Sequence, residues 1–348
     1  MYRVDAVFLD AYVFLGVRLG EKGGEQRRSL WLLDTGASFC VIDQRALPSV
    51  NAVKTRDRVD MRSSTSTSLP VARMPALHVY GKLVKACSTK GRESRAACAT
   101  LIPREDVEMA ESDDDGEGVR SVNVTAVVQD LDGLWRTVLN GDHDRLRPHV
   151  AGVLGYTWLR DYVLRIDWRR KTVWAARRRT APPLQESPAA LVPLRTRLNA
   201  QQMVLLDARL DDLPAIGDAC QKQKASDASW WIVDTGADAS LMSATAVRQW
   251  RLPERVAGDR AVQFTLADAD DIRLTMRQFR RLALVDADDA RVAAAEVRAP
   301  VVLMDRTDAI GALQCAAVGT LGNELWRRIG VVWLDYRRAD RIVWLEPP

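Results

Sequence analysis

The chain has 348 residues, of which 47% are hydrophobic and 28% charged, and its 50 Lys and Arg against 46 Asp and Glu leave a formal net charge of +4. This composition is typical of a folded protein of about two domains and excludes a mainly disordered, collagen-like or coiled-coil chain. The five cysteines form no CxxC pair, and there is no run of about 18 apolar residues and no basic stripe interleaved with aromatics, so we expect no zinc ribbon, no membrane span and no nucleic-acid partner.

Most of the predicted elements are short strands. Runs of Val, Ile, Leu, Trp and Thr alternate with Asp, Gly, Pro and Ser, which is the pattern of a β-rich protein. In chain order, strands are expected over residues 13–19, 29–34, 163–168, 172–176, 203–210, 230–234, 262–266, 272–276, 282–286, 299–304, 330–336 and 341–345. Short helices are expected over 156–162, 244–250 and 323–329.

The N-terminus resembles a signal peptide only superficially. Asp5 and Asp10 interrupt its apolar run, and no small-residue cleavage site follows. We therefore expect a strand here, a cytoplasmic protein, and no prosegment before the first strand.

Two blocks of sequence occur twice in the same order. Residues 30–42 (LWLLDTGASFCVI) match residues 230–242 (WWIVDTGADASLM), and the two aspartates are 200 positions apart. Downstream, residues 152–175 and 319–345 both contain hydrophobic-Leu-Gly, a short helical stretch, Asp-Trp/Tyr-Arg-Arg and a strand ending in Val-Trp. Such a duplication predicts two homologous lobes.

The duplication sets the expected domain boundaries. We expect an N-terminal lobe over 1–178, a Pro-rich linker over 179–200 and a C-terminal lobe over 201–348. Within the first lobe, the like-charged block at 105–117 (EDVEMAESDDDGE) is expected to be a solvated insertion, with a docking tail as the alternative.

Each Asp-Thr-Gly turn presents a carboxylate at the end of a rigid strand. Gly36 and Gly236 permit tight turns close to another backbone. In a pseudo-symmetric chain, Asp34 and Asp234 are expected to face each other across the lobe boundary. Two carboxylates that lie so close together do not both ionise, so the pair shares one proton. The sequence does not say which Asp acts as the acid and which as the base.

These motifs resemble those of the pepsin-like and retropepsin-like aspartic proteases, whose dyad is itself the standard example of such proton sharing. DTGAD at 234–238 has the retroviral form, and DTGAS at 34–38 lies between the retroviral and the pepsin forms. The resemblance implies an all-β chain made of two homologous lobes of the acid-protease fold, with the active site between them. It implies no metal and no organic cofactor.

The resemblance also implies a set of site residues. These are the catalytic Asp34 and Asp234, the active-site loop supports Thr35, Gly36, Thr235 and Gly236, and the substrate-binding Ser38 and Asp238. The two Leu-Gly pairs at 154–155 and 321–322 belong to the strands that thread under the loops. Asp238 either binds the substrate backbone or pairs with a nearby Arg. Ser38, at the equivalent position of the first copy, can take over the role of Asp238 only in part, so the two halves of the cleft are expected to differ.

The expected flaps depart from the family pattern. In the family, a β-hairpin flap with Gly at its tip usually closes over the substrate. The hairpins at the matching positions here are expected over 59–74 and 262–276, and their tips at Ser63–Ser68 and Ala267–Asp271 contain no Gly. Tyr80-Gly81 is expected to end a strand rather than form a flap. The acidic second tip is interpreted as an ordinary polar turn, with a preference for basic substrates as the alternative.

Ala37 and Ala237 stand where pepsins have Ser or Thr. The missing hydroxyls remove a hydrogen bond to the charged dyad, which raises its lower pKa and predicts a mildly acidic optimum. The Trp residues and Cys40 are expected to be core residues rather than functional ones.

The sequence therefore predicts an aspartic endopeptidase, a monomer of two lobes that hydrolyses peptide bonds of a peptide or protein substrate with water activated by Asp34 and Asp234. A catalytically silent binding or assembly module on the same fold is the alternative. A third possibility is that the lobes work only in a larger oligomer.

Overall fold

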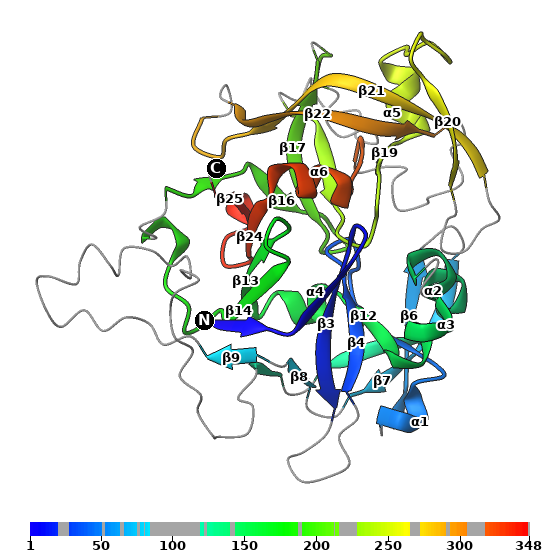
Figure 1. Cartoon of the computed structure of the whole chain (residues 1–348), viewed down its shortest axis with the longest axis vertical. Coiled ribbons are helices and arrows are strands. Elements are labelled where there is room, and N and C mark those ends of the chain that lie inside the picture. The colour runs from blue at the N-terminus through cyan, green and yellow to red at the C-terminus, as the bar shows by residue number, and fades with distance from the viewer. Residues whose placement is uncertain are drawn as a thin grey trace, which may run out of the picture.

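The chain folds mainly into strands, which form three sheets (Figure 1). The structure is a computed structural model and describes residues 1–19, 28–50, 53–62, 66–74, 77–79, 81–83, 119–121, 124–139, 143–186, 190–211, 213–215, 228–264, 272–289, 293–304 and 317–346. The expected all-β class is confirmed. The acidic block at 105–117, Tyr80 and the central residues of both hairpin tips lie outside the described residues.

The first sheet is formed by the first half of the chain. Its strand order is β10-β8-β3-β4-β12-β5-β11-β7-β6, and β2 pairs with β3. The strands are β2 (Ala6–Leu9), β3 (Tyr12–Leu19), β4 (Arg28–Leu33), β5 (Cys40–Asp43), β6 (Val53–Arg62), β7 (Ser66–Arg73), β8 (Leu77–Val79), β10 (Val119–Ser121), β11 (Thr125–Gln129) and β12 (Val150–Leu154). Pairing of β6 with β7 confirms the hairpin expected over 59–74.

The second sheet is formed by the second half. Its order is β16-β17-β18-β23-β19-β22-β21-β20. The strands are β16 (Thr196–Leu198), β17 (Val204–Leu210), β18 (Trp230–Val233), β19 (Ser240–Met242), β20 (Arg260–Phe264), β21 (Ile272–Val285), β22 (Ala293–Leu303) and β23 (Gly319–Leu321). The hairpin expected over 262–276 is the β20–β21 pair, and β21 joins two expected strands across an irregularity between Phe279 and Leu282.

The two sheets share one topology. The order β3-β4-β12-β5-β11-β7-β6 of the first half corresponds strand for strand to β17-β18-β23-β19-β22-β21-β20 of the second. Strand directions also agree, because β4–β12 and β18–β23 are parallel whereas β12–β5 and β23–β19 are antiparallel. The duplicated sequence is therefore a duplicated sheet.

A third sheet joins the two halves. Its order is β15-β25-β24-β13-β14-β1-β9, with β1 (Tyr2–Val4), β9 (Gly81–Leu83), β13 (Tyr162–Asp167), β14 (Thr172–Arg177), β15 (Val192–Pro193), β24 (Val331–Asp335) and β25 (Val343–Leu345). At its centre, β13 and β24 are antiparallel, with Leu164 opposite Leu334. The strands following the Leu-Gly block in each copy thus pair with each other across the lobe boundary.

The segment 179–200 is not the plain linker that its proline content predicts. It contains β15, which pairs with β25, and β16, which pairs with β17. Pro193 is accommodated because β15 is an edge strand and the N–H of the next residue, Leu194, donates to β25, at the carbonyl oxygen of Val343.

The helices are few and short. They are α1 (Leu47–Val50), α2 (Asp132–Leu139), α3 (His143–Leu146), α4 (Tyr156–Leu159), α5 (Ala244–Gln249) and α6 (Asn323–Ile329). α5 and α6 confirm the expected helices, whereas α4 is shorter than predicted because Tyr162 already starts β13. α2 was not predicted from the sequence. Among the described residues, no helix is long and apolar enough to cross a bilayer.

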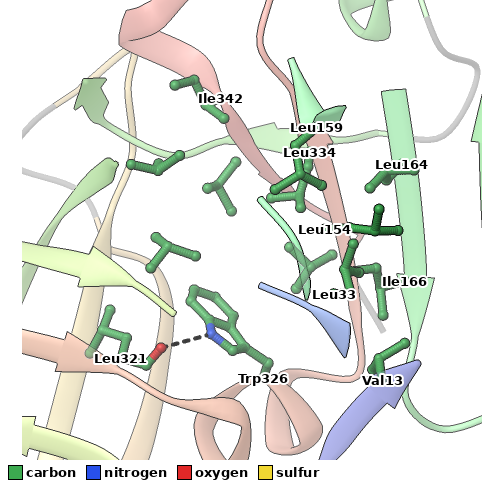
Figure 2. Close-up of a cluster of buried hydrophobic side chains, with 14 of the residues drawn as sticks. Val13, Leu33, Leu154, Leu159, Leu164, Ile166, Leu321, Trp326, Leu334 and Ile342 are labelled. Atoms are coloured by element: carbon green, nitrogen blue, oxygen red, sulfur yellow. Dashed lines mark hydrogen bonds between the residues drawn. The ribbon is translucent and has the colours of Figure 1, made fainter. Parts of the chain in front are cut away.

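The largest core cluster is continuous between the halves (Figure 2). It brings together Val13, Leu33, Leu154, Leu159, Leu164 and Ile166 of the first half with Leu321, Trp326, Leu334 and Ile342 of the second. Trp31, Trp230 and Trp231 are buried, as is the free thiol of Cys40, which confirms their expected core positions. This packing holds the ends of β4 and β18 beside each other.

Candidate active site

Asp34 and Asp234 directly follow the two buried central strands β4 and β18. The Asp34 N–H donates to the carbonyl oxygen of Leu154 at 3.1 Å, and the Asp234 N–H donates to that of Leu321 at 3.1 Å. Each Asp-Thr-Gly turn therefore lies against the Leu-Gly strand of its own half, as the resemblance to the aspartic proteases implies.

The two turns are joined by crossed threonine hydrogen bonds. The Thr35 Oγ1–H donates to the carbonyl oxygen of Val233 at 2.7 Å, and Thr35 Oγ1 accepts from the Thr235 N–H at 3.0 Å. The reciprocal pair runs from Thr235 Oγ1 to the carbonyl oxygen of Leu33 at 2.8 Å and from the Thr35 N–H to Thr235 Oγ1 at 3.0 Å. Both threonines are buried, so the two loops are fixed relative to each other without competition from water.

The two carboxylates are packed into each other's glycine loops. The Gly36 N–H donates to Asp34 Oδ1 at 2.7 Å, and the Gly236 N–H donates to Asp234 Oδ1 at 2.9 Å. A Cβ on Gly36 would lie 2.7 Å from Cγ of Asp234, and a Cβ on Gly236 would lie 2.5 Å from Cγ of Asp34. Only glycine therefore leaves room for the opposite carboxylate, and the two aspartates predicted from the sequence are brought together.

Burial raises the pKa of both carboxyls. At Asp34, the charge of Asp234 raises the pKa further, whereas the N–H groups of Gly36 and Ala37 act in the opposite direction. At Asp234, the main opposing contact is the Gly236 N–H, followed by a hydrogen bond with Asp34. A pair in this setting holds one proton at a pH at which an isolated Asp is ionised. It can therefore accept one proton and donate another within the same small space.

The residues after each turn differ between the halves. Ser38 is half-buried, whereas Asp238 is exposed. Partial burial and then the charge of Glu324 raise the pKa of Asp238, and Arg327 opposes them. Within the part of the chain that the structure describes, the Asp238 carboxylate forms no ion pair, so the alternative of pairing with Arg is not observed. Its substrate-binding role stays a prediction.

A second difference lies below the loops. Asn323, which is fully buried, donates through Nδ2 to the carbonyl oxygen of Thr235 at 2.7 Å, and its Oδ1 has no partner among the described residues. The corresponding position after Gly155 is Tyr156, whose N–H donates to the carbonyl oxygen of Ala37 at 2.9 Å. A side-chain amide therefore supports only the second loop.

Sequence reasoning missed two tyrosines near the pair. Tyr12 lies at the start of β3, and burial followed by the charges of Asp238 and Asp234 raises its pKa. Tyr336 has a buried hydroxyl with no partner in the described structure, and burial, the Tyr156 phenol and the Asp34 charge raise its pKa. Tyr336 belongs to the repeated Asp-Trp/Tyr-Arg-Arg block, which was the available signal, whereas nothing in the sequence marked Tyr12.

The described residues contain no group of three or more His, Cys, Asp or Glu side chains placed to hold a metal ion. The carboxyl pair and the donors around it offer acid–base chemistry at the site. No family model matches the chain, and no curated protein matches it.

Proposed function

We propose that the chain is an aspartic endopeptidase and that its duplicated sheets are the two lobes of an acid-protease fold. One observation carries the proposal. Two carboxyls from equivalent turns are packed against each other's glycine loops, and crossed threonine hydrogen bonds fix the turns. A water molecule held between two such carboxyls is polarised from both sides.

The proposed reaction uses the single proton of the pair. The ionised member takes a proton from the water while the water oxygen attacks the peptide carbonyl carbon. The protonated member donates its proton to the carbonyl oxygen. The resulting tetrahedral diol collapses when the protonated member donates its proton to the peptide nitrogen and the ionised member takes the proton of one diol hydroxyl, which breaks the C–N bond, forms the carboxylic acid and leaves the pair singly protonated. The pKa values of Asp34 and Asp234 are raised together, so acid and base belong to the pair rather than to one residue.

A non-catalytic binding or assembly module is the second candidate. The lack of Gly in both hairpin tips favours it, because a flap that closes on a substrate needs backbone freedom at its tip. Two buried carboxyls favour the enzyme, since a scaffold gains nothing from desolvated acids and loses stability by keeping them.

A transition-state mimic separates the two candidates. The experiment measures binding of statine-containing peptides, which carry a hydroxyl at the tetrahedral carbon, and of the matched deoxy peptides, to the wild-type chain and to Asp34→Asn and Asp234→Asn. A working pair is expected to bind the hydroxyl form at least about 100-fold more tightly, because mimics of the transition state exploit contacts that the ground state lacks. Equal binding of both peptides, or a preference that survives both substitutions, would assign the chain to the binding module.

A further inference from the structure

The second half carries a hollow of about 650 Å³ outside the carboxyl pair. It lies between the end of α5, the turn that follows α5 and the first residues of β21, and none of its lining residues belongs to the Asp-Thr-Gly loops. Its size is within the range of about 300 to 1,000 Å³ that is usual for ligand sites. We call this hollow the arginine groove, after Arg248, Arg251, Arg255 and Arg273, which line it.

None of the four arginines is paired with a carboxylate among the described residues, although the charge of Arg255 acts on Asp259 and helps to lower the pKa of that carboxyl. All are exposed, and none forms an ion pair with any described residue; Arg248 donates a hydrogen bond to Thr245 Oγ1 at 3.4 Å. Elsewhere in the protein, buried arginines are matched: Arg277, behind the groove, binds Asp259 at 2.7 Å. Glu254 is the one acidic residue among the described residues that line the groove, so these residues carry an excess of positive charge.

The floor of the groove is apolar. Leu274 and Met304 are buried there in one hydrophobic cluster, and Leu252 is half-buried at the edge. Guanidinium forks match carboxylates in two-point hydrogen bonds, whereas the floor favours aliphatic groups. The fitting ligand therefore combines several acids with apolar side chains.

The described residues that line the groove include no aromatic side chain, so they offer no platform on which a nucleobase could stack. The arginines also come from three segments, namely α5, the turn after it and β21. We infer that the arginine groove binds an acidic polypeptide segment in which aliphatic residues are interspersed with Asp and Glu. This inference does not depend on the proposed protease activity.

Fluorescence anisotropy of a labelled synthetic peptide of Glu, Asp, Leu and Val tests the inference. The full chain is compared with the double variant Arg248→Gln/Arg273→Gln, which removes charge from both sides of the groove. Arg280→Gln is the matched control, since Arg280 is exposed on the same strand β21 but does not line the groove.

The wild-type chain and Arg280→Gln are expected to bind the peptide equally, and the double variant about tenfold more weakly, since two exposed charge contacts together contribute about that factor. The matched peptide with Gln and Asn in place of Glu and Asp is expected not to bind. If the double variant does not fold, each single substitution provides the same test with a smaller expected loss.

Three results would overturn the inference. These are no binding of the acidic peptide, an equal loss in Arg280→Gln and in the groove variants, and tighter binding of a single-stranded oligonucleotide that competes with the peptide. Displacement of the peptide by inorganic phosphate at millimolar concentration would also overturn the inference, because it would identify a small anion as the ligand of the groove.

Discussion

Asp34 and Asp234 make equivalent contacts, yet their surroundings are unequal. A Gly N–H binds each carboxylate, and each Asp N–H binds a Leu carbonyl oxygen. The amide of Asn323, however, supports only the second loop. The repeated motif predicted the shared contacts because Asp, Thr and Gly act through their own backbone turns. It did not predict Tyr12, which reaches the second loop from a strand far away in the sequence.

The raised pKa of the carboxyl pair predicts a mildly acidic optimum for kcat/KM. The active form carries one proton, so its pH window lies between the two pKa values of the pair. Burial raises the pKa of both carboxyls, which moves that window upward from the range of an isolated Asp. We expect the maximum above about pH 4, and a maximum below about pH 3 would contradict the account.

Ala37→Thr and Ala37→Val provide a matched pair for the same pH profile. Thr adds a donor that stabilises the charged pair and is expected to move the acidic limb to lower pH. Val has the same shape without the hydroxyl and should leave that limb in place. An equal shift in both variants would attribute the change to packing rather than to hydrogen bonding.

At the scale of elements, the ends of β4 and β18 are joined by side chains rather than by a ladder. Four hydrogen bonds between two turns connect strands that belong to different sheets. This arrangement lets each half keep its own sheet while the carboxyls stay in fixed positions.

Thr35→Val is expected to lower the free energy of unfolding by about 2–4 kcal/mol. The substitution leaves the Val233 carbonyl and the Thr235 N–H buried without their partner, at about 1–3 kcal/mol for each group. Chemical denaturation measures the loss. Thr35→Ser keeps the hydroxyl and is the control, and equal stability of the Val and Ser variants would show that the crossed bonds do not stabilise the fold.

Most strands and two helices were predictable from the sequence, because alternating apolar runs and their Asp, Gly and Pro boundaries are local signals. The β20–β21 and β6–β7 hairpins followed for the same reason. α2 was missed because it has only eight residues and is held by tertiary contacts of its buried face, where Trp135 packs in the core and donates to buried Asp43 at 2.8 Å. Two strands within 179–200 were missed. β15 was missed because its partner β25 lies far along the chain, and β16, which pairs with β17, was missed because the proline-rich sequence before it indicates a linker.

At the scale of the whole molecule, the third sheet makes the two halves one structure. β13 and β24 pair at its centre, and Arg165 of β13 binds Glu346 after β25 through Nε at 2.9 Å and Nη2 at 3.1 Å. Trp333 also donates to Glu346, at 3.1 Å. The duplication predicted two lobes but not this sheet, since strand pairing between lobes depends on register that no single copy encodes.

Arg165→Ala is expected to destabilise the whole chain by about 3–5 kcal/mol. Arg165 is 2% exposed, and its removal leaves Glu346 and Asp167 with an uncompensated buried charge. Both halves should lose stability together in denaturation followed by tryptophan fluorescence. Arg338→Ala, which breaks an exposed pair with Asp340, is the control and should cost little stability, because exposed ion pairs are screened by solvent. A comparable loss in both variants would contradict the central role of this sheet.

The most direct test of the carboxyl pair is cleavage itself. The purified chain is incubated with a diverse peptide pool between about pH 3 and pH 7, spanning the ionisation range of the pair, and new termini are mapped by mass spectrometry. Asp34→Asn and Asp234→Asn are tested in parallel, with Asp211→Asn, an aspartate outside the site, as the control. We expect wild-type and Asp211→Asn to cleave the same bonds, and each dyad variant to cleave none. No cleavage at any pH, or cleavage that persists in either dyad variant, would contradict the account.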